Sequence, residues 1–102
     1  MRRRHSSRQA LTVLAALHDR PQTWRHGYEL MGETKLKSGT LYPLLMRLAD
    51  DGLLESEWHA PVPPARAPRH AYRLTAAGRA FAEAALASEQ RQPKDRTFGI
   101  LQ

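Results

Sequence analysis

The chain has 102 residues, of which 41% are hydrophobic and 25% charged, values that are ordinary for one globular domain. Its formal net charge of +6 and pI of about 10.5 indicate a polyanionic partner, either a nucleic acid or a charged membrane surface. The absence of cysteine excludes disulfides, thiolate metal sites and thiol nucleophiles, and no apolar run approaches the ~20 residues of a membrane-spanning helix. We therefore expect a soluble cytoplasmic protein.

The N-terminal region combines a basic segment with the start of a helix. Residues 1–6 form an arginine-rich arm, which is either a solvated tail or a segment that contacts phosphates. Ser6 and Gln9 have the spacing of a capping box, and apolar residues then recur at helical spacing. This pattern predicts a helix over residues 7–18, which Pro21 prevents from continuing.

A second, shorter helix is expected after a polar connection over residues 22–26. It is predicted over residues 27–31 and ends near Gly32. The turn that follows has Leu36 as its single large apolar residue. We expect this side chain to insert into the core between two helices.

The most regular apolar pattern of the chain predicts a third helix over residues 38–51. Ser38 is a candidate N-cap, and Gly52 ends the pattern. Pro43 falls near the helix start, where the loss of one backbone donor costs less than in the middle. The predicted buried face, with its i, i+3, i+4, i+7 spacing, consists of Leu41, Leu44, Leu45 and Leu48.

Two short alternating segments follow, over residues 54–58 and 69–74, and predict an antiparallel pair of strands. The proline-rich residues 61–68 between them cannot form a ladder, so they are expected to make a stiff, exposed hairpin loop. The alternation places Leu54 with Trp58 on one face, and Tyr72 with Leu74.

The last predicted element is a helix over residues 76–90, capped by Thr75 and followed by Pro93, which is expected to end the regular structure. Its apolar face consists mostly of alanine, which suits close packing against another helix. Residues 91–102 are expected to form a flexible tail.

This order of elements predicts a mainly helical fold with a small two-stranded β wing, a winged helix-turn-helix. The domain is expected over residues 7–90, with residues 76–90 as a dimerisation helix. In such a unit the second helix of the helix-turn-helix enters the major groove of DNA, which is wide enough for an α-helix.

The polar side of the third helix supports a DNA-binding role. Its N-terminal half offers hydroxyls, a lysine and free backbone amides, and it has no acidic residue before Asp50. A merely solvated helix face, the alternative, usually mixes charges of both signs. The wing adds Arg66, Arg69 and His70, which could hold phosphates or enter the minor groove, or could serve solubility alone.

Several motifs together resemble one family. They are His26-Gly27-Tyr28-Glu29-Leu30, Leu36-Lys37-Ser38-Gly39-Thr40-Leu41-Tyr42-Pro43-Leu44-Leu45, Arg47-Leu48, Asp51-Gly52-Leu53-Leu54-Glu55-Ser56, Pro68-Arg69, and Tyr72-Arg73-Leu74-Thr75 with Gly78. The combination, over about residues 9–80, is similar to the PadR family of transcriptional regulators. The chain departs from that family in its proline- and alanine-rich wing and in Ala71, where an aromatic residue is common.

The resemblance implies a bacterial homodimeric regulator, more often a repressor than an activator, that binds inverted repeats in promoters. It also implies a small-molecule effector, because many members release DNA on binding one. The residues expected to contact DNA are Tyr28, Lys35, Lys37, Ser38, Gly39, Thr40, Tyr42, Arg47, Arg66 and Arg69. Those expected at the dimer interface are Leu11, Leu14, Phe81, Ala84, Ala85 and Leu86.

Three other functions are alternatives to DNA binding. The histidines lack metal-ligand spacing and no glycine-rich phosphate loop is present, so we expect no enzyme, metal or cofactor. Trp24 and Trp58 are expected in the core or an interface and not in a ligand clamp. A winged helix used only for protein contact remains the main alternative. RNA is disfavoured because side chains do not easily read its deep major groove.

Overall fold

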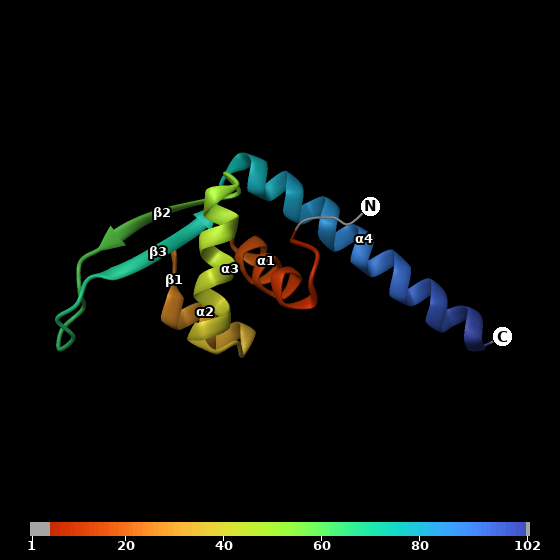
Figure 1. Cartoon of the computed structure of the whole chain (residues 1–102), viewed down its shortest axis with the longest axis horizontal. Helices are drawn as coiled ribbons and strands as arrows, with labels where there is room; N and C mark the ends of the chain where they lie inside the picture. Colours follow the sequence, from red (N-terminus) through yellow and green to blue (C-terminus); the bar gives the residue numbers. More distant parts are fainter. Residues whose placement is uncertain (1–4, 102) are drawn as a thin grey trace.

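The computed structural model describes the backbone of residues 5–101 and the side chains of residues 5–88. Residues 1–4 of the expected basic arm lie outside this range. In Figure 1 the first three helices lie together, the wing hairpin projects on one side and the last helix extends on the other. The elements are α1 (Arg8–Asp19), β1 (Arg25–His26), α2 (Gly27–Thr34), α3 (Ser38–Asp50), β2 (Leu54–His59), β3 (Arg69–Leu74) and α4 (Ala76–Leu101).

The sheet has three antiparallel strands, in the order β1-β3-β2, where two were predicted. The additional strand is β1, which pairs Arg25 with Tyr72 and His26 with Ala71. A strand of two residues has no alternating pattern to detect, so the sequence predicted only a polar connection in this segment. The β2–β3 hairpin itself has the predicted arrangement, with Leu54 opposite Leu74.

Arg25 holds β1 against the helices although it is a charged residue in the interior. Its side chain is fully buried, and its guanidinium donates a hydrogen bond of 2.9 Å to the Ala16 carbonyl of α1. It also pairs with Glu33 and Glu29 of α2. A buried charge needs such partners, so Arg25 connects α1, β1 and α2.

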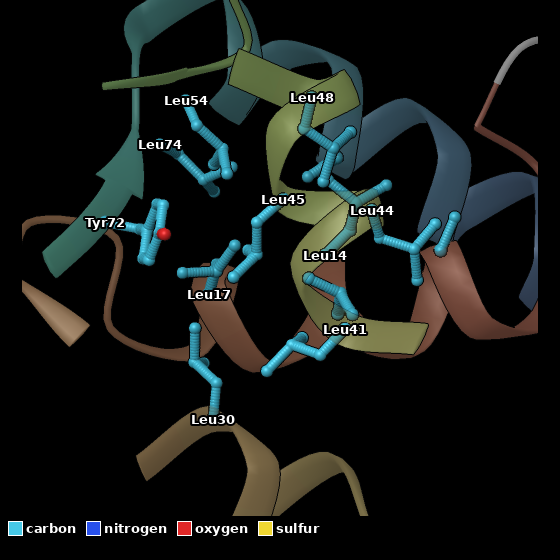
Figure 2. Close-up of a cluster of buried hydrophobic side chains, with 13 residues drawn as sticks. Leu14, Leu17, Leu30, Leu41, Leu44, Leu45, Leu48, Leu54, Tyr72 and Leu74 are labelled. Atoms are coloured by element: carbon cyan, nitrogen blue, oxygen red, sulfur yellow. The ribbon is translucent and has the colours of Figure 1, made fainter. Parts of the chain in front are cut away.

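A leucine core fills the space between α1, α2, α3 and the sheet, and Figure 2 shows the α3 leucines at its centre. The predicted inward face of α3 is confirmed, because all four leucines are buried. Leu36 is half-buried against this cluster, as predicted. The other large buried apolar residues are Val13, Leu14, Leu17, Leu30, Leu54, Tyr72 and Leu74.

The helix starts differ from the predictions in two places. Ser7, not Ser6, caps α1, and its hydroxyl accepts a hydrogen bond from the backbone N–H of Ala10. At α3 the N-cap is Lys37, whose side chain makes no capping bond, and Ser38 is the first helical residue. The Ser38 hydroxyl is therefore one residue too far along the chain to cap this helix.

The helix ends follow local backbone chemistry. Helix α3 ends at Asp50, one residue before the predicted end, and Gly52, which was expected to stop it, has φ of 78°. The N–H of Gly52 donates to the Ala49 carbonyl and that of Leu53 to the Leu48 carbonyl, the two bonds of a Schellman motif. Helix α2 runs past the predicted end at Gly32 to Thr34, because Lys35 adopts the left-handed terminating conformation.

Helix α4 begins where predicted but is longer. The Thr75 hydroxyl accepts a hydrogen bond of 2.9 Å from the Gly78 N–H, which confirms the cap. The helix passes the predicted end at residue 90 and continues through Pro93 to Leu101. Proline removes one backbone bond, but flanking residues of high helix propensity can keep helical geometry on both sides.

Candidate nucleic-acid interface

The start of α3 is open to solvent on the side away from the leucine core. Lys37, Ser38 and Gly39 are exposed, and Thr40 is half-buried. A β-carbon built on Gly39 would meet nothing within 4 Å. Arg47, in the last turn of the same helix, is also exposed. The helix therefore presents its free N-terminal amides and these side chains to an approaching partner.

Tyr42 lies beside this surface but leans toward the protein. Its side chain is half-buried, and its phenol packs on the N-terminus of α2 at Gly27. The nearby Tyr72 is buried, and burial, with Tyr42 as a second cause, raises the pKa of the Tyr72 hydroxyl. The Tyr42 ring thus contributes to packing between the two helices, and a contact of its hydroxyl with DNA stays a prediction.

Two further predicted contact residues lie next to the start of α3. Tyr28 projects from the first turn of α2 with 83% of its surface exposed. Lys35 is exposed at the C-cap of α2, in the turn that leads into α3. The helix-turn-helix therefore places Lys35 and Lys37 on the same turn.

The wing supplies the remaining two predicted residues. Arg66 is exposed in the loop between β2 and β3. Arg69 is half-buried at the start of β3, and its Nε–H donates a hydrogen bond of 3.3 Å to the Ala60 carbonyl. Arg69 thus braces the two ends of the loop in addition to carrying charge.

The cations of this surface lack acidic partners. Within residues 5–88, no ion pair involves Lys35, Lys37, Arg47, Arg66 or Arg69. Three other arginines are paired instead: Arg20 and Arg25 with acidic side chains of α1 and α2, and Arg73 with Glu55 at 2.8 Å. The α3 and wing surface therefore keeps its positive charge available to a polyanion.

A pocket of ≈ 560 Å³ separates the wing from α2 and α3. Its walls include Tyr28, Tyr42, Met46, Trp58, Arg69 and His70. Met46, on the same helix as the buried leucines, is 63% exposed, and no pattern in the sequence indicated it as a site residue. Of the two places expected for Trp58, the core is excluded, because the side chain is 67% exposed and stacks on His70 with ring centroids 4.3 Å apart, and a position in an interface stays a prediction.

The side chains that the structure describes contain no group of three or more His, Asp or Glu residues placed to hold a metal ion. Trp24, the other tryptophan, is half-buried beneath the Arg73 guanidinium, 4.3 Å from the ring centroid. Its role in this chain is packing on the outer face of the sheet.

Comparison with known proteins identifies the family. The family model of the PadR-like transcriptional regulators matches residues 13–84. The chain belongs to this PadR-like family. The matched region contains all ten residues predicted to contact DNA, from Tyr28 to Arg69.

Individual known proteins are similar to this chain over different shares of its length. The transcriptional regulator Rv3488 of Mycobacterium tuberculosis is 52% identical over 56 residues, which is 55% of this chain and 44% of that protein. A PadR-like transcription factor from Bacteroides fragilis is 28% identical with a TM-score of 0.68, over 90% of this chain and 87% of the other.

Two further structures share the fold. A PadR family regulator from Eggerthella lenta is 27% identical with a TM-score of 0.65, covering 96% and 81% of the two chains. NadR in complex with 4-hydroxyphenylacetate is 21% identical with a TM-score of 0.65, covering 94% and 63%. At that identity NadR supports the fold alone.

The dimer residues expected from the PadR resemblance fall into two groups. Leu14 and Ala85 are buried inside the domain, so they are core residues and not available to a partner subunit. Ala84 is exposed, and Leu11, Phe81 and Leu86 are half-buried beside the core. Only this second group can take part in an interface.

None of the described helices of this PadR-like chain is both long and apolar enough to cross a lipid bilayer.

Proposed function

We propose that this chain is a transcriptional regulator that binds double-stranded DNA sequence-specifically. The observation that carries the proposal is the unpaired positive charge around the open start of α3, in a chain of the PadR-like family. In this arrangement α3 enters the major groove, Lys35 and Lys37 lie at its edge, and the wing arginines reach the adjacent backbone or minor groove.

We propose further that the protein binds as a homodimer to an inverted repeat and acts as a repressor. Helix α4 supports the dimer, because it packs on α1 and then continues beyond it (Figure 1). A helix that leaves its own domain in this way offers a surface to a second copy. Two-fold symmetry of the protein would then be matched by two-fold symmetry of the operator.

Selection of bound sequences from random duplex DNA tests the function and the symmetry together. The expected result is an enriched inverted repeat with half-sites about one helical turn apart, ~10 base pairs. Enrichment of a single half-site would retain DNA binding and contradict the dimer. No enrichment above the input pool, with protein that is folded, would contradict sequence-specific binding.

A small-molecule effector is also proposed, and the pocket between the wing and α3 is its candidate site. The volume of ≈ 560 Å³ lies within the range of small-molecule sites, and its walls are largely aromatic. Screening of ligands for a shift in the thermal midpoint, followed by competition with operator DNA, tests this site. A ligand that shifts the midpoint equally in wild type and Met46→Trp would bind elsewhere.

A protein-binding role without DNA is the second candidate. It is favoured by the exposed apolar side chains Tyr28, Met46 and Trp58 around the same pocket, because such patches often mark protein contacts. A gel shift with duplex DNA and duplex RNA at equal concentration separates the possibilities. Preference for duplex DNA supports regulation of transcription, whereas no shift with either supports the protein-binding role.

A further inference from the structure

The outer face of the sheet carries a chain of hydrogen bonds between two strands that are not adjacent. β1 and β2 flank β3, and both His26 and Glu57 are register partners of Ala71. Register partners direct their side chains to the same face, and His59, two residues after Glu57, shares it. His26 Nε2 lies 3.0 Å from His59 Nδ1, and His59 Nε2 lies 2.8 Å from Glu57 Oε2.

The partners restrict where the protons can be. The Glu57 carboxylate can only accept, so His59 carries a proton on Nε2. The bond between the rings needs a proton on one of the two facing nitrogens, His59 Nδ1 or His26 Nε2, and a bare nitrogen opposite it. The remaining nitrogen, His26 Nδ1, lies 4.0 Å from Glu29 Oε1.

Ala71 makes the crossing possible. It lies on the central strand between the two histidine-bearing strands, and it is completely buried. A large side chain at this point of the same face would occupy the space that the two rings bridge.

The charged surroundings disfavour an additional proton on His26. Its burial, followed by the nearby Arg69 and His59, lowers the pKa of His26, while Glu29 acts in the opposite direction. The other charged residues on this face of β2 and β3 are Glu55 and Arg73, which pair with each other at 2.8 Å. From the β1 side, the Trp24 ring packs edge-on to His59 at 5.7 Å.

We propose that His26, His59 and Glu57 form a proton-sensitive latch that holds the wing on the N-terminus of α2, with His59 as the positioning residue. When both histidines carry both ring protons, neither facing nitrogen can accept, and the bond between the two rings is lost. The same state leaves two imidazolium rings with centroids 5.0 Å apart. Both effects loosen the wing strands from the helix-turn-helix.

The latch has a consequence for DNA binding that rests on the proposed function. The loop that joins the latched strand β2 to β3 carries Arg66, and Arg69 begins β3. A loosened wing must be ordered again when these arginines meet the DNA backbone. Acidification thus adds an unfavourable entropy of ordering to the free energy of DNA binding. This term opposes the stronger electrostatic attraction that additional positive charge gives.

Hydrogen–deuterium exchange without DNA tests the latch directly. Protection factors of the β2 and β3 amides, which correct for intrinsic exchange rates, are compared at about pH 7.5 and about pH 5.5, with α1 amides as an internal reference. We expect wing protection in the wild type to fall at least ~3-fold relative to α1 at the lower pH. Equal wing protection at the two pH values would overturn the proposal.

Three variants separate the latch from general effects of charge. His59→Asn keeps an acceptor for His26 but cannot titrate, so it should keep wild-type protection near neutral pH and lose less on acidification. His26→Asn keeps a good N-cap but cannot reach His59, so its wing should be loose already near neutral pH. The control is His18→Asn, because His18 contacts Glu83 of α4 at 3.2 Å, away from the wing.

The outcomes are distinct from those of the DNA-binding tests. Wild-type wing protection in His26→Asn, or an altered wing response in His18→Asn, would refute the latch whether or not the protein binds DNA. A pH response that follows the variants as expected would establish the latch even if no DNA sequence were selected.

Discussion

The phenol of Tyr42 on α3 occupies the space in which a β-carbon on Gly27 of α2 would lie. A β-carbon built on Gly27 overlaps the hydroxyl oxygen and comes within 2.6 Å of the ring carbon Cζ. The two helices of the helix-turn-helix therefore approach each other through a glycine and an aromatic ring, and this contact sets the position of the α3 N-terminus.

Gly27→Ala is expected to lower the free energy of unfolding by about 1–3 kcal/mol, because Tyr42 must leave its position. Gly27 is the first residue of α2, where alanine would otherwise be tolerated. Urea unfolding measures the change, with Gly39→Ala as the control because its β-carbon meets open space. Equal stability of the two variants would contradict a close contact at Gly27.

Gly78→Ala should cost more than a typical helix substitution. A β-carbon there would overlap the Leu53 carbonyl oxygen and lie 2.8 Å from the carbonyl carbon, and backbone cannot move aside as a side chain can. We expect a loss of about 3 kcal/mol in urea unfolding. The matched variant Gly32→Ala, in an open position inside α2, should stabilise by about 0.5–1 kcal/mol. The opposite order of stabilities would rule out this packing.

Lys37→Ala should weaken DNA binding without changing stability. The Lys37 side chain is exposed and makes no capping bond to α3, so the fold does not depend on it. We expect a similar loss of affinity on all duplexes and a fall in the salt slope of about one unit per subunit. A loss confined to the selected sequence would instead assign Lys37 to base recognition, and an unchanged affinity would remove it from the interface.

Ala84→Glu tests the proposed dimer without disturbing the core. Ala84 is exposed on α4, whereas its neighbour Ala85 is buried. Placing a charge at an apolar subunit contact should shift the protein toward monomer, which light scattering at micromolar concentration measures. An unchanged dissociation constant of the dimer would place the interface elsewhere. A wild-type protein that is monomeric would contradict the dimer itself.

Acidification should destabilise the protein through His26. Its pKa is lower in the folded state than the ordinary value of about 6.5, so folding favours the neutral ring. The stabilisation is therefore complete above about pH 6.5 and is lost as the pH falls through the lower, folded-state pKa. The difference in thermal midpoint between wild type and His26→Asn should shrink from pH 7 toward pH 5. A constant difference would show that His26 does not titrate differently on folding.

Periodic features of this chain could be predicted from the sequence. The spacing of Leu41, Leu44, Leu45 and Leu48 specified the buried face of α3, because a repeat of 3.6 residues leaves one apolar side for the core. The glycine at position 52 specified where that helix ends, because its backbone can adopt the positive φ that a Schellman motif needs. The fold class and family followed from such local signals in the right order.

Contacts between distant segments were decided only by the tertiary structure. Strand β1 exists because β3 lies beside it, and Arg25 is buried because Ala16, Glu29 and Glu33 surround its guanidinium. Contacts between distant segments also decide that Trp58 is exposed, that Leu14 is buried and that the Tyr42 ring packs against Gly27. The sequence by itself determined the first three helices, the hairpin strands and the start of the last helix, because those choices depend on neighbours a few residues apart, but it did not indicate strand β1 or the extension of α4 past residue 90. Only the folded chain decided which side chains face a partner, because burial and charge pairing depend on residues that the backbone brings together from far along the sequence.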